Sequence, residues 1–105
     1  MKINVIRNGS VLTLALDGRL DALTSAELEN ALKNSPEGID MLVLDFLKVN
    51  YVSSAGLRVL LNAHKRMSAQ EGMKMTNVNK GVMEILKMTG IADVLSIEQV
   101  QNQNL

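Results

Sequence analysis

Two adjacent serines, Ser53 and Ser54, have the clearest chemical potential in the chain, because they precede a segment with helical hydrophobic spacing. Ser53 can cap this helix by accepting hydrogen bonds from free amides of the first turn. A serine at a helix start is also a suitable phosphate acceptor, since unpaired N–H groups and the positive end of the dipole tolerate an anion. The phosphate would add about −1.5 to −2 charges. The two interpretations are compatible, because one serine can cap while its neighbour is modified.

Enzymatic chemistry finds little support in the same residues. A serine nucleophile needs a base, and the one histidine, His64, lies ten residues after Ser54 on the same predicted helix, about 15 Å along its axis. Neither serine lies in a Gly-x-Ser-x-Gly motif, and phosphate-binding glycine motifs are absent. We therefore expect no catalytic residue, no metal and no cofactor. The spacing of the aspartates also fits no cation loop: Asp17, Asp21, Asp40 and Asp45.

The amino-acid composition narrows the class of protein further. The 105 residues, 47% of them hydrophobic, suit a single domain over 1–105, and the absence of cysteine excludes disulfides. Eleven basic residues balance eleven acidic ones and aromatics are 2%, which argues against a nucleic-acid partner. The chain has no signal-peptide core and no apolar run of about 20 residues. We expect a soluble, cytoplasmic protein without membrane insertion.

The opening segments predict an antiparallel hairpin followed by a helix. Residues 2–7 and 11–17 are strand-like, and Asn8-Gly9 between them favours a tight turn. A helix is then predicted to begin near Thr24. Its expected capping box is formed by the Thr24 hydroxyl and the Glu27 carboxylate.

The middle of the chain predicts a crossover in the sheet. Residues 41–46 are almost continuously apolar, which suits a central strand covered on both faces. Reaching that strand through a helix implies a parallel pairing. A long helix is expected from Ser53 or Ser54 to about Gln70. Its core-facing stripe consists of Gly56, Val59, Leu60, Ala63 and Met67.

The last third predicts a strand over residues 73–78 and a helix capped by Asn79 and closed by Gly90. Residues 91–97 are expected to hold a short strand or helical turn, and residues 99–105 a frayed tail. The resulting order is β-β-α-β-α-β-α with a weak last element. This order is typical of a single-domain α/β layer sandwich, with helices packed on a mixed sheet.

Two segments also carry a family resemblance. Residues 45–61, DFLKVNYVSSAGLRVLL, resemble the signature of anti-sigma factor antagonists, which belong to the STAS domains shared with sulfate transporters. Residues 18–24, GRLDALT, look like the family's Gly-x-Leu-Asp turn into the first helix. The resemblance covers nearly the whole chain and implies a STAS-like fold.

The resemblance implies a partner switch rather than a catalyst. The unphosphorylated antagonist binds an anti-sigma factor that is also a serine kinase, and this binding releases a sigma factor. Phosphorylation by the kinase parts the complex, and a serine phosphatase resets it.

The implied phosphoacceptor is Ser54, two residues before Gly56. Ser53 stands where the family often has Asp, and Ala55 where it often has Ser, so Ser53 is a second candidate acceptor. The expected partner contacts are Asp21, Thr24, Ser53, Ser54, Gly56, Leu57 and Arg58.

Two further possibilities stay open at this stage. Some STAS domains look like constitutive adaptors, for example on a transport ATPase, and such a subunit would bind through the same helix start without modification. A homodimer is also open, since the first strand is expected to form a sheet edge.

Overall fold

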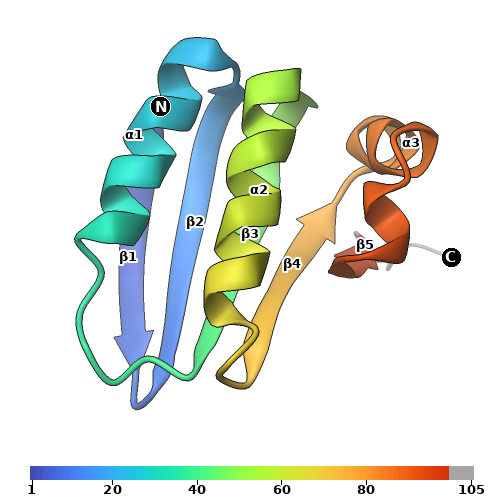
Figure 1. Cartoon of the computed structure of the whole chain (residues 1–105). Coiled ribbons are helices and arrows are strands. Elements are labelled where there is room, and N and C mark those ends of the chain that lie inside the picture. The colour runs from blue at the N-terminus through green and yellow to red at the C-terminus, as the bar shows by residue number, and fades with distance from the viewer. Residues whose placement is uncertain (100–105) are drawn as a thin grey trace, which may run out of the picture.

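A five-stranded mixed sheet forms the centre of the protein, shown in Figure 1 as a computed structural model that describes residues 1–99. Strand β1 pairs antiparallel with β2, and all later neighbours pair in parallel. The predicted hairpin, crossover and mixed sheet are therefore confirmed. In spatial order the strands are β1 (Lys2–Asn8), β2 (Val11–Leu20), β3 (Met41–Val52), β4 (Gly72–Val78) and β5 (Ser96–Gln99).

Two helices, α1 (Ala22–Lys33) and α2 (Ser54–Met67), lie side by side on one face of this sheet (Figure 1). Helix α3 (Lys80–Met88) and a short 3₁₀ turn (Ile91–Asp93) follow β4 and lie beyond it in the same view. The observed order matches the predicted β-β-α-β-α-β-α with a weak last element. None of the helices described in residues 1–99 is long and apolar enough to cross a membrane.

The core lies between the sheet and the helices α1, α2 and α3. The strand register aligns buried side chains in rows: Leu12 faces Leu42, which faces Met73, and the next row repeats this with Leu14, Leu44 and Met75. The helices complete the core with buried leucines at the expected helical spacing, Leu28, Leu32 and Leu60.

The expectation that the central strand is covered on both faces is wrong. Along the first half of β3, buried Leu42 and Leu44 alternate with Met41 and Val43, which are only half-buried. The alternation shows that the helices cover one face of this strand. An apolar run alone could not reveal this, because Met41 and Val43 are tolerated on a half-exposed face.

Strand β3 also continues past the predicted end at Phe46, because it contains a bulge. Leu16 on β2 is matched by two residues on β3, Phe46 and Leu47, since the register shifts between the pairs on either side. The Asp45 carboxylate holds this bulge by accepting hydrogen bonds from the Leu47 amide and from Asn77 Nδ2, each at 3.0 Å. This shift brings Val49 back toward the core. A second shift, between the pairs Gly18–Val49 and Leu20–Val52, brings Val52 to the same face.

The C-terminal predictions hold with small changes. Asn79 caps α3 by accepting from the Val82 amide at 2.8 Å, as expected. Helix α2 ends at Met67 rather than near Gln70, and Gln99, expected in the frayed tail, belongs to β5. The rest of that predicted tail, residues 100–105, lies outside the described residues. The outer edge of β1 has no neighbouring strand within residues 1–99, so the homodimer stays a prediction.

Candidate functional site

The starts of α1 and α2 meet at one edge of the sheet, where β2 and β3 end together. Leu20 pairs with Val52 at this end, and the Ser53 amide donates a 2.8 Å hydrogen bond to the Leu20 carbonyl. Each helix begins directly after these residues, so the caps Asp21 and Ser53 lie close together. We call the exposed parts of Asp21, Leu23, Ser54 and Arg58 the helix-start edge.

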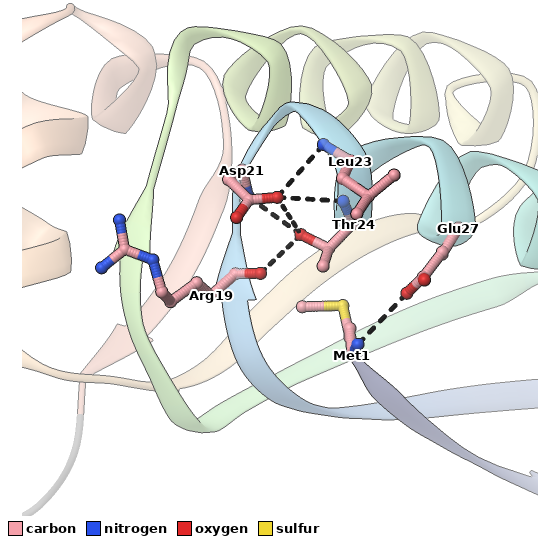
Figure 2. A network of polar contacts seen from close by, with 6 residues as sticks. All are labelled: Met1, Arg19, Asp21, Leu23, Thr24 and Glu27. Carbon is pink, nitrogen blue, oxygen red and sulfur yellow. Dashed lines mark hydrogen bonds and ion pairs between the residues drawn. The ribbon is translucent and has the colours of Figure 1, made fainter.

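Helix α1 begins earlier than predicted, and Asp21 rather than Thr24 is its cap. Asp21 Oδ1 accepts hydrogen bonds from the amides of Leu23 and Thr24 at 3.1 and 3.0 Å (Figure 2). The Thr24 hydroxyl completes the capping box by accepting from the Asp21 amide and donating to the Arg19 carbonyl. The predicted capping box of Thr24 and Glu27 is therefore wrong, and Glu27 instead pairs with the N-terminal ammonium group at 3.2 Å.

This hydrogen bonding also sets the charge of the edge. The Thr24 amide lowers the pKa of the Asp21 carboxyl below its ordinary value, with smaller contributions from the Thr24 hydroxyl, the Leu23 amide and the charge of Arg19. Partial desolvation acts in the opposite direction and does not prevail. Asp21 therefore carries a fixed negative charge at neutral pH, in a fixed orientation.

The two serines have different roles at the start of α2. Ser53 is the cap, and its half-buried Oγ accepts from the Gly56 amide at 3.3 Å. Ser54 is exposed, and its hydroxyl makes no hydrogen bond to any atom of residues 1–99. One serine is thus occupied by the helix and its neighbour is free for chemistry or contact.

Gly56, one of the predicted partner contacts, is buried and presents no exposed surface. A Cβ placed on Gly56 would lie 2.9 Å from Leu20 Cγ and Val52 Cγ1, and 3.0 Å from the Leu20 carbonyl oxygen. Real Cβ atoms essentially never approach that closely. Glycine therefore lets the first turn of α2 rest on the strand ends and places Ser54 at the edge.

The remaining predicted contacts divide between surface and core. Arg58 is exposed, whereas Leu57 is half-buried and packs against the core. The hydroxyl of half-buried Thr24 is used inside the α1 cap, so Thr24 positions Asp21 rather than presenting a free group. Arg58 borders a shallow groove between α1 and α2 with a volume of about 240 Å³ and walls that include Ala22, Ala26, Glu29, Ala55 and Asn62.

Sequence reasoning missed two features beside the edge. Leu23, in the first turn of α1, leaves 76% of its surface exposed. The sequence could have indicated this exposure, because Leu23 lies five positions before Leu28. That spacing is out of phase with the buried stripe of α1. The Arg19 guanidinium lies 4.3 Å from the centre of the Tyr51 ring, a cation–π contact. Leu20 and Val52 face the helices, so their neighbours Arg19 and Tyr51 lie on the opposite face of the sheet.

Two other features with chemical potential, His64 and an apolar hollow, lie away from Ser54. His64 lies on α2, ten residues further along the helix, and its buried Nδ1 has no hydrogen-bond partner in the described part of the chain. An apolar hollow of about 280 Å³ lies at the other end of α1 and α2, beside residues 35–39.

The fold and this edge define a small α/β domain that presents two helix starts and one free serine hydroxyl. The sequence matches the family model of the STAS domain over residues 2–103, so the chain belongs to the STAS domain family. The predicted family and fold class are thereby confirmed.

Known proteins similar to this chain include anti-sigma factor antagonists. The anti-sigma-B factor antagonist of Listeria monocytogenes is 26% identical over 100 residues, which cover 92% of this chain and 87% of that protein. An anti-sigma factor antagonist from Mycobacterium paratuberculosis has a similar crystal structure, with a TM-score of 0.79, 21% identity, and coverage of 92% and 84%. The Bacillus cell-fate determinant SpoIIAA in its phosphorylated form is also similar, with a TM-score of 0.67, 13% identity, and coverage of 91% and 90%.

Proposed function

We propose that this chain is an anti-sigma factor antagonist that binds an anti-sigma factor with serine kinase activity through the helix-start edge. Binding of the unmodified chain releases a sigma factor, and phosphorylation of Ser54 ends the interaction. The proposal is supported by the Listeria relative, which is an anti-sigma-B factor antagonist. In this role the chain is a regulatory substrate of the kinase and catalyses nothing itself.

The observation that carries the proposal is the contrast between the two serines. Ser54 is exposed and its hydroxyl is free of hydrogen bonds within residues 1–99, whereas Ser53 Oγ is engaged by the Gly56 amide. Modification of Ser53 would remove a helix cap, and modification of Ser54 would not. The phosphorylated form of SpoIIAA, which has a similar fold, supports a phosphorylated state for such a domain.

Phosphorylation would change the charge of the edge without any rearrangement of the fold. The γ-phosphoryl group passes from ATP to Ser54 Oγ, ADP leaves, and the hydroxyl proton goes to the base of the kinase. The phosphate adds about −1.5 to −2 charges beside the fixed carboxylate of Asp21. A partner surface that fitted the neutral hydroxyl then meets a bulky dianion and loses its fit.

The test uses the purified chain, ATP and the anti-sigma factor kinase of the same organism. We expect label in the parent and in Ser53→Ala, and none in Ser54→Ala. Ser53→Ala is the matched control, since it alters the adjacent hydroxyl and leaves the acceptor in place. Equal labelling of Ser54→Ala and the parent would overturn the assignment of the acceptor.

A second measurement distinguishes the phosphorylation switch from the alternative function, a constitutive adaptor subunit that is never modified. Phosphopeptides of the native protein are mapped in cells sampled during growth and stress with phosphatases inhibited. Phosphate on Ser54 whose occupancy changes with condition supports the switch and its serine phosphatase. An unmodified Ser54 under every condition, with a stable complex on a transport ATPase, would replace the switch by the adaptor.

A further inference from the structure

Arg58 stands out among the charged residues of the helix-start edge, because it lies four residues after Ser54 on α2. Its side chain is exposed and makes no ion pair with any residue of 1–99. Side chains four positions apart on a helix are neighbours, with Cβ atoms about 5–6 Å apart. Helical side chains also lean toward the N-terminus, so the Arg58 stem leans toward the turn that contains Ser54.

Two other charged groups near this edge already have contacts, and the charge of Arg19 also acts on the Asp21 carboxyl. The Asp21 carboxylate is held by the amides of its own helix, and Arg19 lies against the Tyr51 ring on the opposite face of the sheet. Glu29 borders the same α1–α2 groove as Arg58, but the two make no ion pair within 4.0 Å. Arg58 is therefore an exposed cation on α2, four positions from Ser54, that makes no ion pair within residues 1–99.

We propose that Arg58 is an intramolecular binding site for the phosphate of phosphorylated Ser54, an inference that rests on the proposed function. The planar guanidinium can donate two parallel N–H bonds to phosphate oxygens, which is the geometry that arginine provides and lysine does not. The positive end of the α2 dipole also favours an anion at this position.

This contact would make one modification act on two parts of the docking surface. In the unmodified chain, Ser54 presents a neutral hydroxyl and Arg58 a free positive charge. After phosphorylation, Arg58 turns to the phosphate and no longer offers its charge to the partner. The partner then meets added negative charge at Ser54 and no longer has the positive charge of Arg58 opposite it. Contacts between acidic groups of the partner and Arg58 are therefore lost together with the contact to the Ser54 hydroxyl.

The test installs phosphoserine at position 54 during synthesis of the full chain, so no kinase is required. A ³¹P NMR titration then measures the pKa for the second ionisation of the phosphate, from monoanion to dianion, in the parent and in Arg58→Gln. Arg58 favours the dianion, so we expect the parent phosphate to bind its proton about two- to fivefold more weakly, with a correspondingly lower pKa. The difference should shrink in high salt, and Arg58→Lys should retain only part of it.

The matched control moves the guanidinium by one turn. The double variant Arg58→Gln with Asn62→Arg keeps the net charge and the groove but places the cation eight residues from position 54. It should titrate like Arg58→Gln. Identical titrations of the parent and Arg58→Gln, with both proteins folded by amide NMR, would overturn the inference.

The result is separable from the proposed function. Kinase labelling of Ser54 tests whether the residue is an acceptor, whereas the titration tests only whether Arg58 binds a phosphate placed there. A shifted titration with an unlabelled Ser54 would remove the switch and keep the binding geometry. A labelled Ser54 with an unshifted titration would keep the switch and remove the role of Arg58.

Discussion

Replacing Gly56 with alanine tests how the first turn of α2 is seated on the sheet. The added Cβ would lie 2.9 Å from two core side-chain carbons, on Leu20 and Val52, and 3.0 Å from the Leu20 carbonyl oxygen. Side chains can yield by rotation, but the carbonyl belongs to the backbone and also accepts the Ser53 amide. Helix α2 must therefore move outward, and the link between the two helix starts must stretch.

The expected cost follows from two opposing effects. Overpacking of a well-filled core costs about 1–3 kcal/mol. Alanine for glycine inside a helix returns up to about 1 kcal/mol through helix propensity. We therefore expect Gly56→Ala to lower the free energy of unfolding by about 1–2 kcal/mol. This corresponds to a fall in Tm of roughly 5–15 °C for a domain of this size.

Urea denaturation of Gly56→Ala, read by circular dichroism, measures this cost, and Gly81→Ala is its matched control. Gly81 is exposed in the first turn of α3, and its added Cβ would meet nothing closer than Asn79 Oδ1 at 3.5 Å. Gly81→Ala should therefore be neutral or stabilising by about 0.5 kcal/mol. A Gly56→Ala protein as stable as Gly81→Ala would refute the close-approach argument.

Four further substitutions probe the edge and the bulge. Ser53→Ala should cost about 1 kcal/mol through loss of the α2 cap, whereas Ser54→Ala should stay within about 0.5 kcal/mol, and chemical denaturation compares them. Asp21→Asn should match the parent in Tm at low pH and fall behind it at neutral pH. The reason is that the pKa of Asp21 is lower in the folded chain than in the unfolded one. The ionised carboxylate therefore stabilises the fold at pH above the ordinary aspartate pKa, and this stability is lost as the pH falls through the lowered pKa of the folded state. Asp45→Ala should destabilise by about 1–2 kcal/mol, because the Leu47 amide and Asn77 Nδ2 lose their acceptor; equal unfolding midpoints would show that the bulge does not depend on this carboxylate.

The elements that sequence predicted well are those with strong local signals. Asn8-Gly9 sets the hairpin turn, with Gly9 at a φ of +63°, and Ser53 and Asn79 begin helices where a polar cap precedes an apolar stripe. At the start of α1, two capping patterns overlap. Asp21 with Thr24 and Thr24 with Glu27 have the same spacing, and only the fold, which draws Glu27 to the N-terminal ammonium, decides between them.

The features that escaped prediction depend on contacts between distant residues. The β3 bulge requires Asn77, thirty-two residues away, as a partner of Asp45. The pairing of Arg19 with Tyr51 arises only once β2 and β3 lie in register. For the candidate site, the sequence and the resemblance indicated Ser54 and Asp21. That Ser53 caps α2 while the Ser54 hydroxyl stays exposed could be decided only from the hydrogen-bond geometry.

The hydrogen bond from the Ser53 amide to the Leu20 carbonyl closes a stretch of more than thirty residues that includes all of α1 and all of β3. The edge is consequently a non-local contact, and we expect it to form late in folding because its loop-closure entropy must first be offset. A partner that binds this edge therefore binds only chains in which the β2–α1–β3 crossover has formed. We expect a nascent or partly opened chain to lack this surface. The Ser53 amide should accordingly exchange its hydrogen only through large-scale opening, which makes it a reporter of the fraction of molecules competent to bind.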